Sequence, residues 1–318
     1  MPQIFLVGLG AGIAAALLFA SIASGSMLSL VLFYVCPLPI FIVALGWSHW
    51  AGLIAALVAS AGLAAVFANY LAMAFLLGIG LPAWWLSYLA LLARPVATAA
   101  GAVLEWYPIG RLVLWTAALS GFVVVAALFT LGTTEETIRT ELRRGFESIV
   151  PRQDALDLAG PSDSRTALDA LVVAAPPAAA ISVTFINLIA LWLAARIVRV
   201  SHRLRRPWPD LTQLEFPPAA AIVFALMLAG MLLTGLIALM SGIFAASLGT
   251  AYVILGFAVL HTITRGMNAR GLVLSGAYVA AVLIWPVVPL IALLGVADSM
   301  MGIRRRIRRL PGPPNLPT

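Results

Sequence analysis

Polar residues inside apolar segments are the part of this sequence that could do chemistry. Asn187 lies in the middle of an apolar run, and His261 ends another. A polar side chain is costly inside a membrane unless it has a partner, so both residues are candidates for lining a ligand cavity. For Asn187, a hydrogen bond to a neighbouring helix meets the same need and is the favoured alternative.

Prolines and tryptophans form a second group of candidates. Pro37 and Pro39 interrupt the second apolar run, and Trp84 and Trp85 lie in the fourth. Broken helices at membrane depth are where transporters build binding sites, because unwound backbone offers free carbonyl and amide groups. These four residues are therefore ligand-binding candidates, although tryptophans near the ends of spans more often anchor a helix at the interface. The fourth run is also loosened ahead of its tryptophans by Gly78, Gly80 and Pro82.

Small residues recur every four positions along the first apolar run, at Gly8, Gly12, Ala16 and Ala20. Such a strip lines one face of a helix and lets another helix approach closely. One interpretation is a docking face for a separate integral membrane subunit. Packing against another helix of the same chain is the more common use of such strips.

Catalytic and metal-binding patterns are missing from the sequence. The three histidines, His49, His202 and His261, are far apart, and neither HExxH nor GxSxG occurs. All 19 basic residues are arginine, which excludes a Schiff-base lysine and the lysine-bearing phosphate loop. With Cys36 as the only cysteine, there is no CxxC pair. We expect no enzyme, no metal site and no cofactor.

The composition indicates that lipid is the solvent for most of the chain. Hydrophobic residues make up 63% of the sequence, charged residues 10%, and the mean hydropathy is +1.06. A soluble domain of this length needs far more polar surface. The net charge of +7 does not indicate nucleic acid, because the arginines cluster at the ends of apolar runs. We predict an all-α polytopic transmembrane bundle of about 8–10 spans in the lipid bilayer.

Nine apolar runs are long enough to cross the hydrocarbon layer, which takes about 20 residues in a helix. The predicted spans are residues 4–23, 28–45, 50–68, 70–92, 112–131, 177–198, 218–240, 244–262 and 272–296.

Arginines in short loops predict the orientation of the spans. Five arginines between residues 196 and 215 place that loop in the cytosol of a bacterial inner membrane, and residues 133–170 then form an extracytoplasmic insertion. Within the insertion, Thr133 and Glu136 have the spacing of a capping box. An amphipathic helix should follow and lie on the membrane surface through Ile138, Leu142, Phe146 and Ile149. Pro176 and Pro177 should mark the entry into the next span.

The arginine-rich C-terminus conflicts with nine crossings. Residues 1–303 should form one integral domain, and residues 304–318 a basic, then proline-rich, cytosolic tail. An even number of crossings is needed to bring both arginine clusters to one side, so one late segment must be irregular. The run 271–303 is the suspect because Pro286 and Pro289 interrupt it. Asp298 should pair with these arginines and fix the end of the last helix.

The chain resembles the YybS-like family of bacterial polytopic membrane proteins of unknown function, built on the domain of unknown function 2232. The resemblance rests on short motifs spread over nearly the whole chain: Pro37-Leu38-Pro39, Leu45-Gly46-Trp47, Leu81-Pro82-Ala83-Trp84-Trp85, Trp106-Tyr107-Pro108, Gly110-Arg111, residues 256–261, and Leu294-Gly295-Val296-Ala297-Asp298 before Arg304-Arg305-Arg306.

That family looks similar in fold to the substrate-binding S-components of energy-coupling-factor transporters. The resemblance implies a helical bundle that binds a vitamin-like solute and docks on a partner permease through its first helix. The chain departs from it in having about nine segments rather than six. We expect a solute-binding or permease-like transport component. The alternative is a membrane scaffold in envelope or cell-shape assembly.

Overall fold

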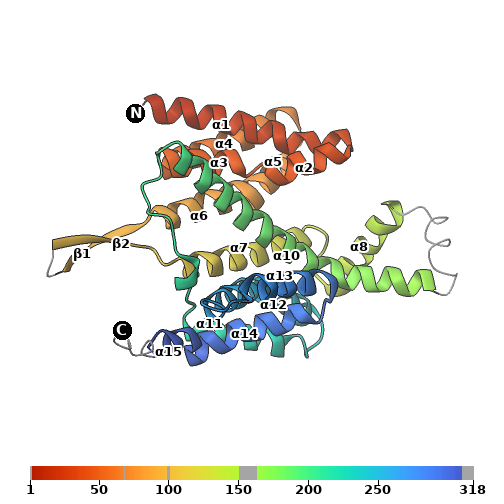
Figure 1. The fold of residues 1–318 in the computed structure, drawn as a ribbon. Helices are drawn as coiled ribbons and strands as arrows, with labels where there is room; N and C mark the ends of the chain where they lie inside the picture. Colours follow the sequence, from red (N-terminus) through yellow and green to blue (C-terminus); the bar gives the residue numbers. More distant parts are fainter. Residues whose placement is uncertain (1, 68, 99–100, 150–162, 310–318) are drawn as a thin grey trace, which may run out of the picture.

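Long apolar helices dominate the computed structural model, which describes residues 2–67, 69–98, 101–149 and 163–309 (Figure 1). Seven helices in these ranges are long and apolar enough to cross a membrane, and three further apolar helices are shorter. The protein is therefore an all-α polytopic bundle, as predicted. The long candidates are Pro2–Ser24, Met27–Gly46, His49–Val66, Asn69–Leu91, Ile109–Phe129, Thr166–Val200 and Leu236–Ile263.

The N-terminal part of the bundle packs around alanines of α1 and α4 and larger apolar side chains of α3, together with side chains of α6 and α10. Proline and serine set the helix boundaries here. Pro37 begins a new helix after Cys36, and the Ser48 hydroxyl accepts a hydrogen bond from the amide of Trp50 at the start of α4. The elements are α1 (Pro2–Ala20), η1 (Ser21–Ser24), α2 (Met27–Val35), α3 (Leu38–Gly46), α4 (His49–Val66), α5 (Asn69–Phe75), η2 (Leu76–Gly80) and α6 (Leu81–Leu91).

The C-terminal part has its own core, in which α7, α11, α12 and α14 surround Tyr252 and Leu255. In Figure 1, α10 crosses from this part to the N-terminal part. The elements are α7 (Ile109–Phe129), α8 (Glu135–Ile149), α10 (Asp163–Val200), η3 (Leu211–Gln213), α11 (Pro218–Gly230), α12 (Leu236–Ile263), α13 (Arg270–Leu283), α14 (Val287–Met301) and α15 (Ile303–Arg309).

Each of the first six predicted spans lies on one helix or on consecutive helices, whereas the last three do not have the predicted boundaries. The seventh was predicted to reach residue 240, whereas α11 ends at Gly230 and a turn with Gly235 at φ +74° leads into the longer α12. The ninth breaks at residues 284–286 into α13 and α14, so the irregular segment is the one suspected from its prolines.

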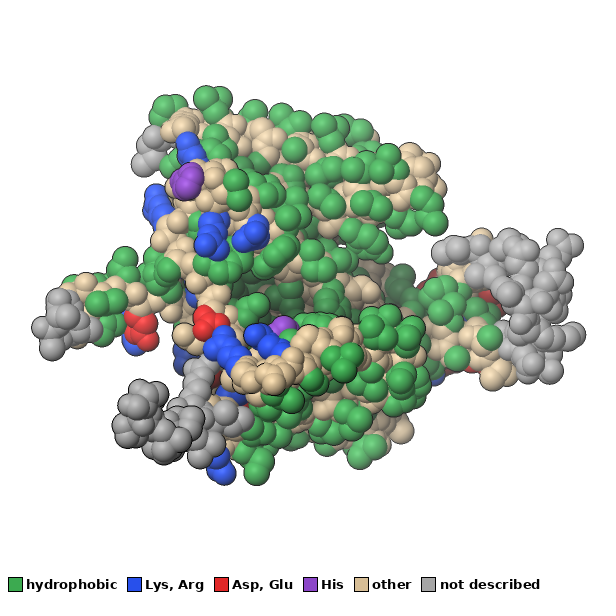
Figure 2. Space-filling view, in the orientation of Figure 1, with side chains coloured by type: hydrophobic (Ala, Val, Ile, Leu, Met, Phe, Trp, Pro, Cys, Tyr) green, Lys and Arg blue, Asp and Glu red, His purple; other side chains and the backbone are tan. Residues whose placement is uncertain are grey.

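This break brings the two arginine clusters to the same end of the bundle. Arg265, after α12, donates to the Thr212 hydroxyl at 3.3 Å, and Arg304, after α14, donates to the Thr212 carbonyl at 3.0 Å. Thus α12 and α14 run in parallel and end together beside the arginine-rich loop, as the even-crossing prediction requires. Figure 1 shows the N-terminus and α15 at this end, and Figure 2 shows arginine side chains gathered there on a largely apolar surface.

A β-hairpin, which the sequence analysis did not predict, projects from the same end (Figure 1). Strands β1 (Ala93–Thr98) and β2 (Gly101–Trp106) pair antiparallel, with Arg94 opposite Glu105 in an ion pair of 2.7 Å. Val103 and Leu104 are 55% and 57% exposed. The hairpin is thus an apolar ribbon that the described part of the chain leaves uncovered on these residues.

The predicted extracytoplasmic helix exists, but it packs differently. Thr134, rather than Thr133, caps α8, because its hydroxyl accepts the Thr137 amide at 3.2 Å. Ile138 is only 2% exposed and lies in a core with residues of α7, α10 and α12, so the prediction that it contacts the membrane surface is wrong. In the folded bundle, Ile138 is buried against neighbouring helices rather than against lipid.

The predicted start of the sixth span at Pro177 is also wrong, because α10 begins at Asp163 and runs through both prolines. Its 13 residues before Pro176 add about 20 Å of helix that contacts α8. Residues 150–162 of the predicted insertion and 310–318 of the predicted tail lie outside the described residues. Arg304, assigned to that tail, is instead 4% exposed and part of the bundle.

Candidate functional site

A cavity of about 1140 Å³ separates α5, η2 and α6 from α7. We call this cavity the α5–α7 groove. Its lining on α7 extends from Trp115 to Thr130, which is about 22 Å of helix. This length is about two thirds of the hydrocarbon thickness of a bilayer. The groove therefore has the dimensions of a long chain rather than of a compact solute.

A π-helical turn forms part of the opposite wall. Residues Leu76–Gly80 form η2, where the fourth span was predicted to be loosened by its glycines, and Pro82 follows in the first turn of α6. Leu77 and Gly78 line the groove. A Cβ added at Gly78 would lie 3.6 Å from Val123 of α7, so glycine keeps this side of the groove open. Single π turns of this kind are frequent at functional sites.

Tryptophans line the groove near the end that carries the hairpin. Trp84 and Trp85 are 6.1 Å apart between ring centroids, and Trp85 meets Trp115 edge to face at 5.8 Å. The Trp115 indole donates to the Tyr107 hydroxyl at 3.1 Å. The Trp84 indole nitrogen is buried and has no hydrogen-bond partner in the described structure. A buried donor without a partner is destabilising, and this nitrogen is closed off from the groove as well as from water, so the part of Trp84 that lines the groove is its apolar ring.

The lining of the groove limits what it can hold. Its residues are apolar or aromatic except for the hydroxyls of Tyr70 and Thr130, and none of the described lining residues is charged. Ions and sugars would lose their hydration here without compensation. The arrangement suits an extended apolar molecule.

The remaining predicted site residues lie elsewhere. Asn187 is buried in α10 and donates to the Val183 carbonyl of its own helix at 3.0 Å, whereas the predicted alternative was a bond to a neighbouring helix. His261 is hydrogen-bonded to the Tyr278 hydroxyl of α13 at 3.0 Å. Pro37 and Pro39 mark the α2–α3 boundary without lining the groove. The structure therefore brings together only Trp84 and Trp85 among the ligand candidates.

The small-residue strip of the first helix packs within the chain. A Cβ added at Gly8 would lie 3.0 Å from the Ala51 carbonyl oxygen, and one at Gly12 would lie 2.7 Å from that of Ala55. Ala16 and Ala20 pack against the same core. The strip is thus occupied by α4 and neighbouring helices, so a partner subunit could reach these glycines only by displacing α4.

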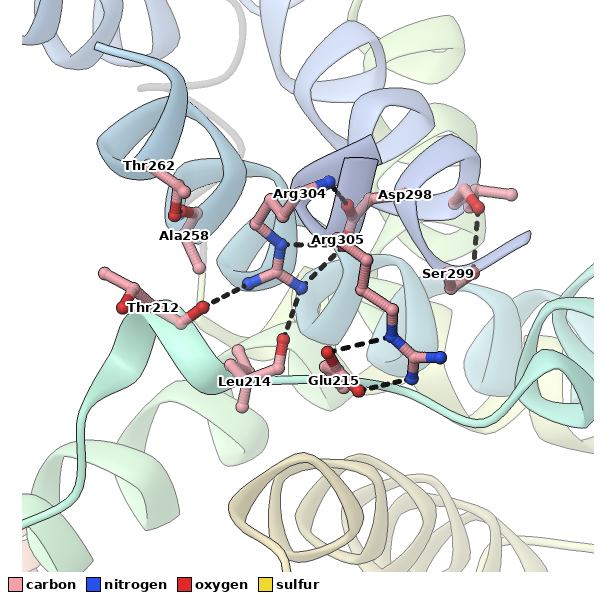
Figure 3. Close-up of polar contacts among 10 residues, drawn as sticks. Thr212, Leu214, Glu215, Ala258, Thr262, Asp298, Ser299, Arg304 and Arg305 are labelled. Atoms are coloured by element: carbon pink, nitrogen blue, oxygen red, sulfur yellow. Dashed lines mark hydrogen bonds and ion pairs between the residues drawn. The ribbon is translucent and has the colours of Figure 1, made fainter. Parts of the chain in front are cut away.

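A buried polar network fixes the C-terminal end of the bundle (Figure 3). Asp298 and Arg304 form the ion pair predicted from the sequence, with Arg304 Nε 2.8 Å from Asp298 Oδ2. Arg304 also donates to backbone carbonyls of the loop, including that of Thr212. Nearby, Arg305 Nε donates to Glu215 at 3.1 Å, and this bond lowers the pKa of the Glu215 carboxyl. The network anchors α14 and α15 to the loop.

Comparison with known proteins gives one finding. The sequence model of a family described as "Predicted membrane protein (DUF2232)" matches residues 12–299, which is most of the chain. No curated protein and no solved structure matches it.

Proposed function

We propose that this chain, which belongs to the DUF2232 family of predicted membrane proteins, binds a long, apolar, lipid-like molecule in the α5–α7 groove. The observation that carries this proposal is the uncharged, largely apolar cavity of about 1140 Å³, with the hydroxyl-bearing residues Tyr70 and Thr130 in its lining. Binding sites for small molecules are mostly apolar and carry a few placed polar groups, as here. The proposed role is binding without catalysis or a cofactor.

The proposal narrows the expected transport role to an apolar cargo. The resemblance to YybS-like proteins and to S-components supports a binding subunit that works with a separate permease. No nucleotide-binding motif occurs in the sequence, so energy for transport would come from a partner. Since α4 occupies the glycine face of α1, we expect that partner to contact another surface.

The binding proposal is tested by what the purified protein retains. After extraction in mild detergent and washing, mass spectrometry of an organic extract should find one class of long-chain molecule in near-stoichiometric amount. Gly78→Leu places a bulky side chain in the groove and should remove that molecule. Gly62→Leu is the matched control, since nothing lies within 4 Å of a Cβ there. Identical extracts from all three proteins would contradict the proposal.

The proposed orientation places the arginine-rich end in the cytosol of a bacterial inner membrane, as the positive-inside rule requires. The only native cysteine, Cys36, is fully buried, so an introduced cysteine reports its own exposure. A membrane-impermeant maleimide on intact cells should label Glu147→Cys. It should label Arg205→Cys and Arg306→Cys only after permeabilisation. Labelling of Arg306→Cys from outside would contradict the even-crossing orientation.

The hairpin favours the second candidate, a scaffold role. Its exposed Val103 and Leu104 form a short apolar edge at the arginine-rich end, which suits contact with another protein. Replacing residues 94–105 by a short glycine-serine turn tests this. Loss of one specific partner from a native-membrane pull-down, with the retained long-chain molecule unchanged, would favour the scaffold.

A further inference from the structure

A second cavity, of about 290 Å³, lies where the N-terminal and C-terminal cores meet at the arginine-rich end. Leu91 and Leu191 contribute to it from one core, and Val113 and Ile254 from the other. The loop at residues 201–217 closes it with Pro207 and Trp208. Arg206 is the one charged side chain among the described residues that line this cavity, which we call the Arg206 cavity.

Two hydrogen bonds orient the Arg206 side chain. Its Nη1 donates to the Ala90 carbonyl at 3.1 Å, and its Nη2 to the Tyr107 carbonyl at 2.8 Å. A guanidinium has five N–H donors, so three remain after these bonds. The two carbonyls are neutral, and no carboxylate among the described residues forms an ion pair with Arg206. Within the part of the chain that the structure describes, the positive charge is therefore held at the cavity without a counter-ion, and burial lowers the pKa of Arg206.

The surroundings strengthen the positive potential. Trp208, which lines the cavity, has the guanidinium carbon of Arg199 4.9 Å and that of Arg196 5.5 Å from its ring centroid. Several unit charges of one sign thus surround a wall that is otherwise apolar. Such a site favours an anion whose remainder is apolar, because the charged group meets guanidinium donors and the rest is removed from water.

A structural role alone explains only part of this arrangement. Arg206 binds the Ala90 carbonyl at the end of α6, where a cation is favoured by the helix dipole. That contact uses one N–H donor of the Arg206 guanidinium. It does not explain why an apolar cavity lies beside this charged group. We infer that the Arg206 cavity binds the phosphate or carboxylate group of an amphiphile whose apolar part enters between the two cores. This site is separate from the α5–α7 groove, and the inference does not depend on the function proposed for that groove.

The test uses three soluble probes with the full-length protein in neutral detergent. They are dihexanoyl phosphatidylglycerol, dihexanoyl phosphatidylcholine and inorganic phosphate, and dissociation constants are measured by native mass spectrometry. The anionic lipid should bind more tightly than the zwitterionic one. Arg206→Met should weaken its binding roughly 10- to 100-fold, which corresponds to loss of charge-assisted hydrogen bonds. Arg205→Met, which removes the same charge from an exposed neighbour, should leave it nearly unchanged.

Arg206→Lys keeps the charge without the planar fork and should give intermediate affinity; it also serves where Arg206→Met does not fold. Binding of inorganic phosphate alone, with the same dependence on Arg206, would identify a free anion as the ligand and would still support the site. Equal affinities for both lipids, or equal losses in the Arg205 and Arg206 variants, would overturn the inference. Gly78→Leu should not change lipid binding at the Arg206 cavity. A failure of the groove proposal can therefore be distinguished from a failure of this inference.

Discussion

The crossing of α12 and α14 gives the sharpest prediction about stability. Gly256 and Gly295 face each other there: a Cβ added at Gly256 would lie 2.0 Å from the Ile291 carbonyl oxygen, and one at Gly295 would lie 2.3 Å from that of Tyr252. Both obstacles are backbone atoms, which cannot rotate away as a side chain can. Gly256→Ala must therefore push the two helices apart.

The magnitude follows from the packing that would be lost. Separation by 0.5–1 Å forfeits roughly a quarter to a half of each dispersion contact along the crossing. Overpacking typically costs about 1–3 kcal/mol, and we expect about 3 kcal/mol here because the clash is with backbone. The control, Gly242→Ala, lies on the same helix with only a flexible Met231 methyl at 4.0 Å, so it should be neutral or stabilising.

Unfolding in mixed micelles with increasing sodium dodecyl sulfate measures both variants. A Gly256→Ala protein as stable as the Gly242→Ala protein would refute the close backbone crossing. The double variant with Gly295→Ala provides a second check. Because one separation relieves both clashes, its loss of stability should be smaller than the sum of the single losses.

Further predictions concern the arginine-rich end. Asp298→Asn leaves buried Arg304 without its counter-ion and should cost about 3–5 kcal/mol in the same unfolding assay; a loss below about 1 kcal/mol would contradict the buried pair. Because the folded-state pKa of Glu215 is depressed, its stabilising contribution should be complete above its ordinary value of 4.5 and be lost as pH falls through the folded value. Arg305→Ala should remove that dependence of unfolding stability on acid pH. An unchanged pH profile of stability would contradict the stabilising Arg305–Glu215 interaction. Leu104→Asp, on the exposed hairpin, should change stability by no more than about 0.5 kcal/mol, so a larger loss would show that the hairpin packs on the bundle.

Hydropathy predicted the early spans well because lipid-facing and buried positions are both apolar in a membrane bundle. The same property hid the late boundaries. Residues 231–235, Met-Leu-Leu-Thr-Gly, turn the chain between α11 and α12 but contain no charge and no proline, so their hydropathy does not separate this turn from a span. Prolines gave useful information only in part: Pro286 lies at a real break, whereas α10 continues through Pro176 and Pro177.

The candidate sites were predictable only in fragments. Trp84 and Trp85 were found as residues next to a loosened helix, but the α5–α7 groove also needs α7, which no local pattern pairs with them. Arg206 looked like one of several topology arginines, because its neighbours Ala90 and Tyr107 are about a hundred positions away in sequence. The hairpin was missed since its strands are short and become ordered by pairing with each other.

The central claim is that the α5–α7 groove holds a long apolar molecule, and photo-crosslinking tests it most directly. A palmitate analogue with a mid-chain diazirine would be added to the protein in vesicles, and the labelled peptides mapped by mass spectrometry. We predict labelling concentrated on Met73, Leu77 and Phe122 of the groove. Residues of α13 such as Val282, which is 83% exposed, should be labelled less despite their greater exposure. Labelling that simply follows exposure, with α13 above the groove, would contradict the claim.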